Sequence, residues 1–164
     1  MWQLSGFVQG DSGITTTIKR LSSHLIAVPA KMRAFTPSKL IEPREEGKWS
    51  RQQILGHLVD SAINNLKRFT DIQFLPQPYT IQSYMQEELV LANNYNLLPL
   101  EHVLSLWESL NRQIIFVAEN IPEEKLSYAV KPGYDDNATH TLEWLIADYV
   151  AHLEHHLIQI FGSE

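Results

Sequence analysis

Four stretches of the chain place apolar residues at the spacing of an amphipathic helix, and no stretch of comparable length alternates as a β-strand does. The predicted helices cover about residues 14–35, 51–74, 100–121 and 141–160. This pattern predicts an all-α fold built as a single four-helix bundle.

Capping and breaking residues set the ends of these helices. Ser50, with Gln53 three residues later, forms a capping box at the start of the second helix. Prolines flank the third helix, and Gly162 is a suitable stop for the fourth. Pro29 interrupts the first, which we expect to be two pieces or a kinked helix.

The connecting loops are long, and they cover residues 36–49, 75–99 and 122–140. Residues 82–94 could form a short extra helix within the second loop. Long connections do not force neighbouring helices to be antiparallel, so crossovers between distant ends of the bundle are possible.

Composition narrows the class of protein. The chain has 164 residues, a net charge of −6 and no cysteine, so we expect one domain spanning residues 1–164. The absence of cysteine excludes disulfides, thiolate zinc sites and a cysteine nucleophile. An acidic chain is a poor match to a phosphate backbone, so we expect no nucleic-acid partner.

Location follows from absent signals. No apolar run approaches the about 18–20 residues of a membrane span, so we expect no membrane partner. Residues 1–13 lack the basic and apolar regions of a secretory signal, which makes the cytoplasm the expected location.

The fourth predicted helix carries histidines near its interior face. At 100° per residue its apolar arc contains His156, and His152 lies on the edge of that arc. His155 falls farther round, near Trp144 and Asp148. The arc itself consists of Leu142, Ile146, Tyr149, Leu153, Leu157 and Ile160.

The second predicted helix carries a complementary polar stripe. His57, Ser61, Asn64 and Arg68 follow one another beside its apolar arc. A stripe facing solvent would usually hold more lysine and glutamate, so this one is expected to line a cavity. The apolar arc consists of Ile54, Leu58, Ala62, Leu66 and Phe69.

Two histidines four residues apart on one helix and a third on another are a common way to build a three-histidine metal site. Imidazole suits zinc, nickel, copper and iron, and three protein ligands leave a coordination position open. A histidine satisfied by hydrogen bonds in the core is the structural alternative. The remaining His24, His102 and His140 have no such partners and are expected at the surface or in local hydrogen bonds.

Two groups of motifs resemble a known family. The first surrounds the second predicted helix and reads GKWS (47–50), ILGHLVDS (54–61), NN (64–65) and RF (68–69). The second reads TLEWLI (141–146) and HLEHHLIQI (152–160). The combination resembles the DinB-like superfamily (damage-inducible, YfiT-type) of metal-dependent enzymes, over about residues 25–160.

This resemblance implies a bundle of up-down-down-up connectivity that holds one divalent metal ion, commonly zinc or nickel. The implied ligands match His57, His152 and His156, the same trio that the helical projection selects. Homodimers are common among relatives, and known activities include transfer of low-molecular-weight thiols and thiol-dependent isomerisation. Residues 1–13 match nothing in the family and form an N-terminal extension of unknown role.

The first functional hypothesis is therefore an enzyme whose metal activates a water or a small thiol against a small-molecule substrate, as a hydrolase or thiol transferase. Arg68 would bind a substrate carboxylate, and Asp60 or Asp148 would orient a ligand imidazole. Ser61 and Asn64 complete the candidate pocket. No general base stands out, so no catalytic residue is assigned.

Two other hypotheses stay open. One is a non-catalytic metal-binding, dimerising stress-response module, whose apolar contact surface would use Trp107, Phe116 and residues 82–94. The other is a DNA-associated repair factor, which the net charge and the lack of a basic helix with interleaved aromatic residues disfavour.

Overall fold

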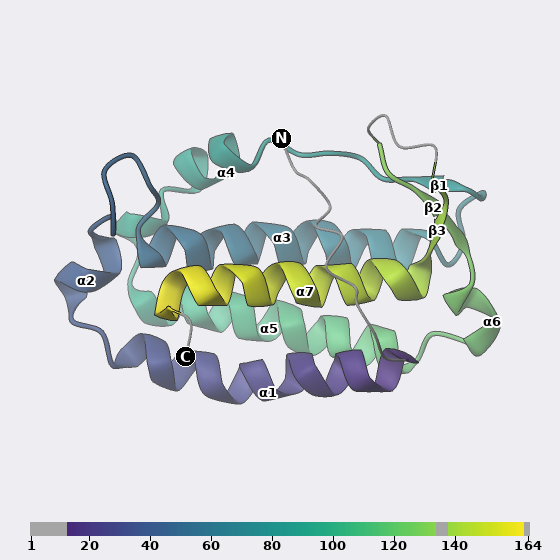
Figure 1. Cartoon of the computed structure of the whole chain (residues 1–164), viewed down its shortest axis with the longest axis horizontal. Coiled ribbons are helices and arrows are strands. Elements are labelled where there is room, and N and C mark those ends of the chain that lie inside the picture. The colour runs from purple at the N-terminus through teal and green to yellow at the C-terminus, as the bar shows by residue number, and fades with distance from the viewer. Residues whose placement is uncertain (1–12, 134–137, 163–164) are drawn as a thin grey trace.

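Four long helices form the body of the molecule, as predicted (Figure 1). They are α1 (Gly13–Arg33), α3 (Arg51–Asp71), α5 (Leu100–Glu119) and α7 (Leu142–Phe161). The computed structural model describes residues 13–133 and 138–162. Apart from residue 13, the expected N-terminal extension lies outside the described residues.

The order of the helices in the bundle confirms the up-down-down-up connectivity. Helix α1 packs against α5 and α7, and α3 packs against the same two helices. Figure 1 shows α1 and α7 running in one direction and α3 and α5 in the other. Because α3 and α5 are parallel neighbours, the chain between them has to return along the length of the bundle.

This return segment explains the long second loop. It contains α4 (Gln86–Asn93) and the 3-10 helix η1 (Tyr95–Leu97), and α4 confirms the short helix predicted within residues 82–94. Two further short helices, α2 (Pro37–Ile41) and α6 (Glu123–Leu126), lie in the other connections.

Side-chain caps fix the beginnings of α3 and α7. The Ser50 hydroxyl accepts from the backbone N–H of Gln53 at 3.1 Å, and the Gln53 side chain accepts from the N–H of Ser50 at 2.9 Å. Thr141 caps α7 by accepting from the N–H of Trp144 at 3.1 Å. The capping box predicted from the sequence is therefore present.

Of the two alternatives predicted for the first helix, the division into two pieces is wrong. Pro29 does not divide it, because the helix runs without interruption to Arg33. Proline removes one backbone donor and leaves one carbonyl, that of Leu25, without its helical partner. The buried ring of Pro29 packs into the core, and the single lost bond does not end the helix.

A small sheet, which the helical pattern did not predict, closes one end of the bundle (Figure 1). Strand β2 (Ala129–Lys131) pairs in parallel with β1 (Tyr79–Thr80) and antiparallel with β3 (His140–Thr141). Strands of two or three residues are too short to show a period of two in the sequence. The fold remains all-α with a minor sheet.

The predicted apolar arcs form the core. All six apolar residues predicted on the fourth helix are buried, as are Ile54, Leu58, Ala62 and Phe69 on α3. Trp107 is fully buried, so it cannot belong to the contact surface considered for a binding module, whereas Phe116 is 60% exposed. Among the described residues, no helix combines the length and the apolarity needed to cross a membrane.

Candidate metal centre

Three imidazoles from two helices converge between α3 and α7. His57 lies in the second turn of α3, and His152 and His156 lie in successive turns of α7. Because α3 and α7 run in opposite directions, the beginning of one lies beside the end of the other (Figure 1). Residues separated by 95 positions in the chain thus share one site.

The nitrogen atoms are spaced for a shared ion. The Nε2 atom of His152 lies 3.4 Å from Nε2 of His57 and 3.0 Å from Nε2 of His156. One ligand atom from each of the three residues falls within 4.8 Å of the others. Imidazoles bound at 2.0–2.1 Å in tetrahedral geometry would hold their nitrogens about 3.4 Å apart. The donor set fits a divalent metal ion.

Burial keeps these imidazoles neutral. It lowers the pKa of His152 to about 2, of His57 to about 3 and of His156 to about 4, and the neighbouring histidines lower the pKa of His57 and His152 further. A metal ligand needs the neutral imidazole with a free lone pair. The cluster therefore offers metal-binding nitrogens at any pH near neutrality.

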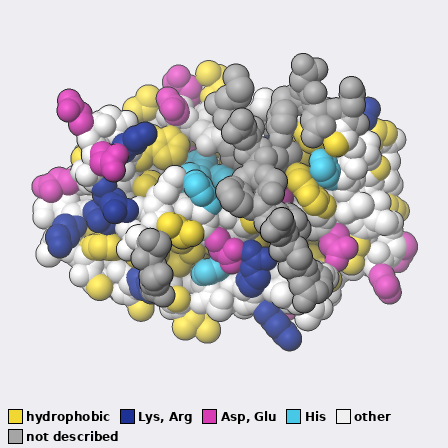
Figure 2. Space-filling view, in the orientation of Figure 1, with side chains coloured by type: hydrophobic (Ala, Val, Ile, Leu, Met, Phe, Trp, Pro, Cys, Tyr) yellow, Lys and Arg dark blue, Asp and Glu magenta, His cyan; other side chains and the backbone are white. Residues whose placement is uncertain are grey.

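Neighbouring side chains orient the cluster. The Oε1 atom of Gln159 accepts from Nδ1 of His156 at 2.7 Å, which leaves Nε2 of that ring as the lone-pair nitrogen. The Trp49 ring lies 5.1 Å from the His57 ring. Both His57 and His152 are buried and His156 is partly exposed. Figure 2 shows histidine side chains reaching this face of the molecule.

The other histidines are not members of the cluster, although the His155 ring lies 5.4 Å from the His156 ring. His155 is exposed, as the projection predicted, and its Nε2 lies 3.1 Å from the Gln159 amide. His140 stacks on Trp144 with ring centroids 3.8 Å apart. His24 makes a tertiary contact that the sequence did not indicate, because its Nε2 lies 3.0 Å from the Glu154 carboxylate.

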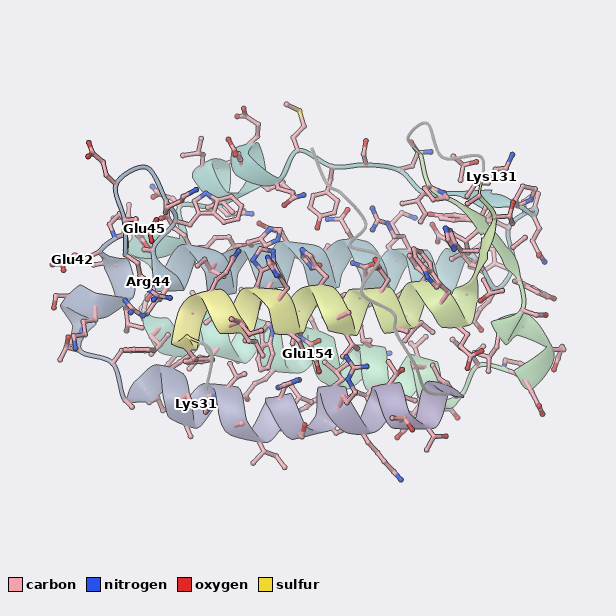
Figure 3. All side chains as sticks on the ribbon, in the orientation of Figure 1. Lys31, Glu42, Arg44, Glu45, Lys131 and Glu154 are labelled. Carbon is pink, nitrogen blue, oxygen red and sulfur yellow. The ribbon has the colours of Figure 1, made fainter. Side chains whose placement is uncertain are left out.

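Glu154 joins α7 to α1. Figure 3 shows its side chain directed from α7 toward α1, where Arg20 and His24 bind its carboxylate. Burial opposes ionisation of Glu154, but the hydrogen bonds from His24 and Arg20 outweigh it and lower the pKa to about 2. This network fixes the helix that carries two of the three imidazoles.

The polar stripe of α3 continues from His57 along the buried side of the helix. Ser61, Asn65 and Arg68 are buried. The Asn65 amide donates to the Ser61 carbonyl at 2.9 Å, and its Oδ1 accepts from Arg68 at 3.3 Å. Asn65 was not among the residues predicted for this stripe. It follows Ser61 by four residues, as Ser61 follows His57.

Asn64 and Asp60 have partners away from the histidines. The Asn64 amide donates to the Asp60 carbonyl of its own helix at 2.8 Å. The Asp60 Oδ1 accepts from the Tyr95 hydroxyl at 2.7 Å and from the Asn93 amide at 2.9 Å. These bonds tie the return segment to α3, and burial raises the pKa of Asp60.

Arg68 on α3 and Asp148 on α7 are both buried between these two helices. Arg68 donates to the Gln82 carbonyl at 2.6 Å and lies over the Tyr84 ring, with 5.6 Å to its centroid. Asp148 is 1% exposed. Burial raises its pKa to about 7, against the opposing effect of the Arg68 charge. The two side chains form no ion pair within 4.0 Å, although each affects the pKa of the other.

Sequence reasoning missed Trp49, Tyr84 and Gln159 as neighbours of these groups. Gln159 carried a readable signal, because it lies three residues after His156 on the same helix. Trp49 and Tyr84 come from connecting segments, and no periodicity places such residues against a helix.

Comparison with known proteins identifies the family of this chain. The family model of the DinB superfamily matches residues 19–160. A protein of Oceanobacillus iheyensis is 22% identical over 143 residues, 87% of this chain and 80% of its own length. A protein of Halalkalibacterium halodurans is 26% identical over 140 residues, which cover 83% of this chain and 80% of its own. Both are named "putative metal-dependent hydrolase".

A solved structure shows the same fold. YfiT from Bacillus subtilis, described as a probable metal-dependent hydrolase with an unusual four-helix bundle topology, gives a TM-score of 0.81 at 21% identity. The match covers 93% of this chain and 87% of YfiT. With the family model matching most of its length, this chain belongs to the DinB superfamily.

Proposed function

We propose that this protein is a metal-dependent enzyme in which His57, His152 and His156 hold one divalent ion, zinc or nickel. The observation that carries the proposal is the convergence of three neutral Nε2 atoms at 3.0 and 3.4 Å. A divalent ion held by three imidazoles supplies Lewis acidity, which makes a water or a small thiol nucleophilic near neutral pH. The names of the relatives support the hydrolase form of this chemistry.

Residues around the three histidines orient these ligands and favour one class of substrate. Gln159 fixes the tautomer of His156, and the Trp49 ring shields one side of His57 from water. The buried Arg68 guanidinium places a fixed positive charge on the same stripe of α3, where it favours an anionic group such as a carboxylate on the substrate. A thiol, if one is used, comes from a second molecule, because the chain has no cysteine.

Metal analysis tests the site. The purified chain is expected to bind about one equivalent of zinc or nickel, with three histidine ligands as in open catalytic sites. His57→Ala and His156→Ala are expected to lower the affinity at least tenfold. His155→Ala, a matched change on the exposed side of α7, is expected to leave it unchanged. Equal metal loading in all three variants would end this assignment.

Turnover separates the two chemistries. The metal-loaded chain is offered generic esters and amides with water alone, and generic electrophiles with glutathione or bacillithiol. Turnover lost on chelation and restored by metal supports the proposal, and the productive arm identifies hydrolysis or thiol transfer. Turnover that survives both chelation and His57→Ala contradicts it.

A further inference from the structure

The carboxyl group of Asp148 is buried without a hydrogen-bond partner among the described residues. Both of its oxygens are inaccessible, and the side chain is 1% exposed. Leaving a carboxyl in the interior with neither oxygen bonded is strongly unfavourable. An orphaned group of this kind in a folded protein calls for an explanation, and a partner supplied by a ligand is one.

The nearby cation does not satisfy Asp148. Arg68 is tethered elsewhere, through Nη2 to the Gln82 carbonyl and through Nη1 to Asn65 Oδ1. It acts on Asp148 through space, beyond ion-pair distance. Its charge favours the ionised carboxylate, but burial outweighs this effect and raises the pKa of Asp148 overall.

The position of Asp148 relates it to the histidine cluster. It precedes His152 by four residues on α7, so the two side chains project from the same face, about 6 Å apart along the helix axis. The carboxylate is not one of the groups that come within 4.8 Å of one another in the cluster. Asp148 therefore stands beside the metal ligands and outside their set.

We propose that Asp148 binds the hydrogen-bond donor of a small ligand, an amino or a hydroxyl group, that lies a few bonds from the atom held at the three-histidine centre. The spacing of one helical turn matches such a compact molecule. The inference rests on the proposed function and adds a substrate class to it: small molecules with an N–H or O–H group close to the reacting atom.

Three hydroxamates of matched size test this. Propionohydroxamate, glycolohydroxamate and glycine hydroxamate share the metal-binding head and differ by a methyl, a hydroxyl and an amino group at the same position. Calorimetric titration into the zinc-loaded full-length chain gives each Kd. Because the three heads differ in acidity, the ratio of variant to wild-type Kd for each compound is the quantity compared.

Asp148→Leu replaces the acceptor with a larger apolar side chain, and Asp148→Asn keeps the shape while removing the charge. We expect Asp148→Leu to weaken the hydroxyl and amino compounds about tenfold and the methyl compound less than twofold. Asp148→Asn is expected to weaken the same two compounds more than the methyl compound, by a smaller factor. It replaces the leucine variant in the test if that variant does not fold. Asp71→Asn, at the far end of α3, is expected to change no ratio.

The outcomes are distinct. Equal weakening of all three compounds, or none, at unchanged zinc content would assign Asp148 a structural role and overturn the inference while leaving the proposed function intact. A wild-type chain that binds neither zinc nor any hydroxamate would overturn the proposed function, and the inference with it.

Discussion

At the scale of single residues, the interior of the bundle holds polar groups that a plain apolar core would not contain. Asp148 is the clearest case, because burial raises its pKa to about 7 from the usual 3.8. The folded state then binds the Asp148 proton more tightly than the unfolded state does. Such a group lowers stability as the pH rises from about 4 to about 7, and has no further effect above that range.

This shift predicts a pH-dependent stability difference for Asp148→Asn. In metal-free protein, the variant should match the wild type near pH 4 and exceed it near pH 8, by up to about 4 kcal/mol. Urea unfolding at pH 4, 5.5, 7 and 8 measures this. The three histidines with lowered pKa act in the opposite direction in both proteins, so the difference isolates Asp148. A difference that does not vary with pH would contradict the assignment.

At the scale of elements, the return segment between α3 and α5 is fixed to α3 by one close approach. A Cβ atom at Gly56 would overlap the Tyr95 ring of η1, so glycine is required at this point of α3. The approach brings the Tyr95 hydroxyl to Asp60, and the Gln52 side chain donates to the Tyr95 carbonyl at 2.7 Å. The turn of α3 that carries His57 is thereby packed against η1.

Gly56→Ala is therefore expected to destabilise the fold although alanine favours helices. Overpacking against the buried Tyr95 ring costs about 1–3 kcal/mol, which exceeds the helical gain of about 1 kcal/mol. Chemical unfolding of Gly56→Ala, Tyr95→Ala and the double variant tests the cause. The double variant should lose less than the sum of the single losses. Strict additivity would show that the clash is not with Tyr95.

At the scale of the whole molecule, the histidine cluster links two helices that are far apart in sequence. A bound ion at His57, His152 and His156 would join α3 to α7 and stabilise the folded state by mass action. The same ion binds weakly to the unfolded chain, where the three ligands are dispersed.

Chelation is expected to lower the melting temperature. Metal at a hundred times its Kd contributes about 2.7 kcal/mol, which corresponds to a shift of about 5–10 °C for a chain of this size. Thermal unfolding with and without EDTA measures it. His155→Ala should show the full shift and His57→Ala almost none. A shift of the same size in His57→Ala would place the metal elsewhere.

Much of this protein was determined locally. The apolar period of each long helix, the capping box at Ser50 and Gln53, and the placement of His155 on the exposed side of α7 follow from short-range spacing, which the sequence displays directly. The convergence of His57 with His152 and His156 was predicted because each lies on a face whose direction the apolar arc reveals. The family resemblance independently selected the same three residues.

The tertiary structure alone decided what depends on contacts between distant segments. Pro29 stays within one helix, and the end of the bundle carries a sheet of strands too short to show a period. Asn65, not Asn64, makes the buried contacts of the polar stripe, and the Asp60 carboxylate accepts a hydrogen bond from Tyr95. Each of these features depends on which residue of another segment packs against it, and helical spacing carries no information about that residue.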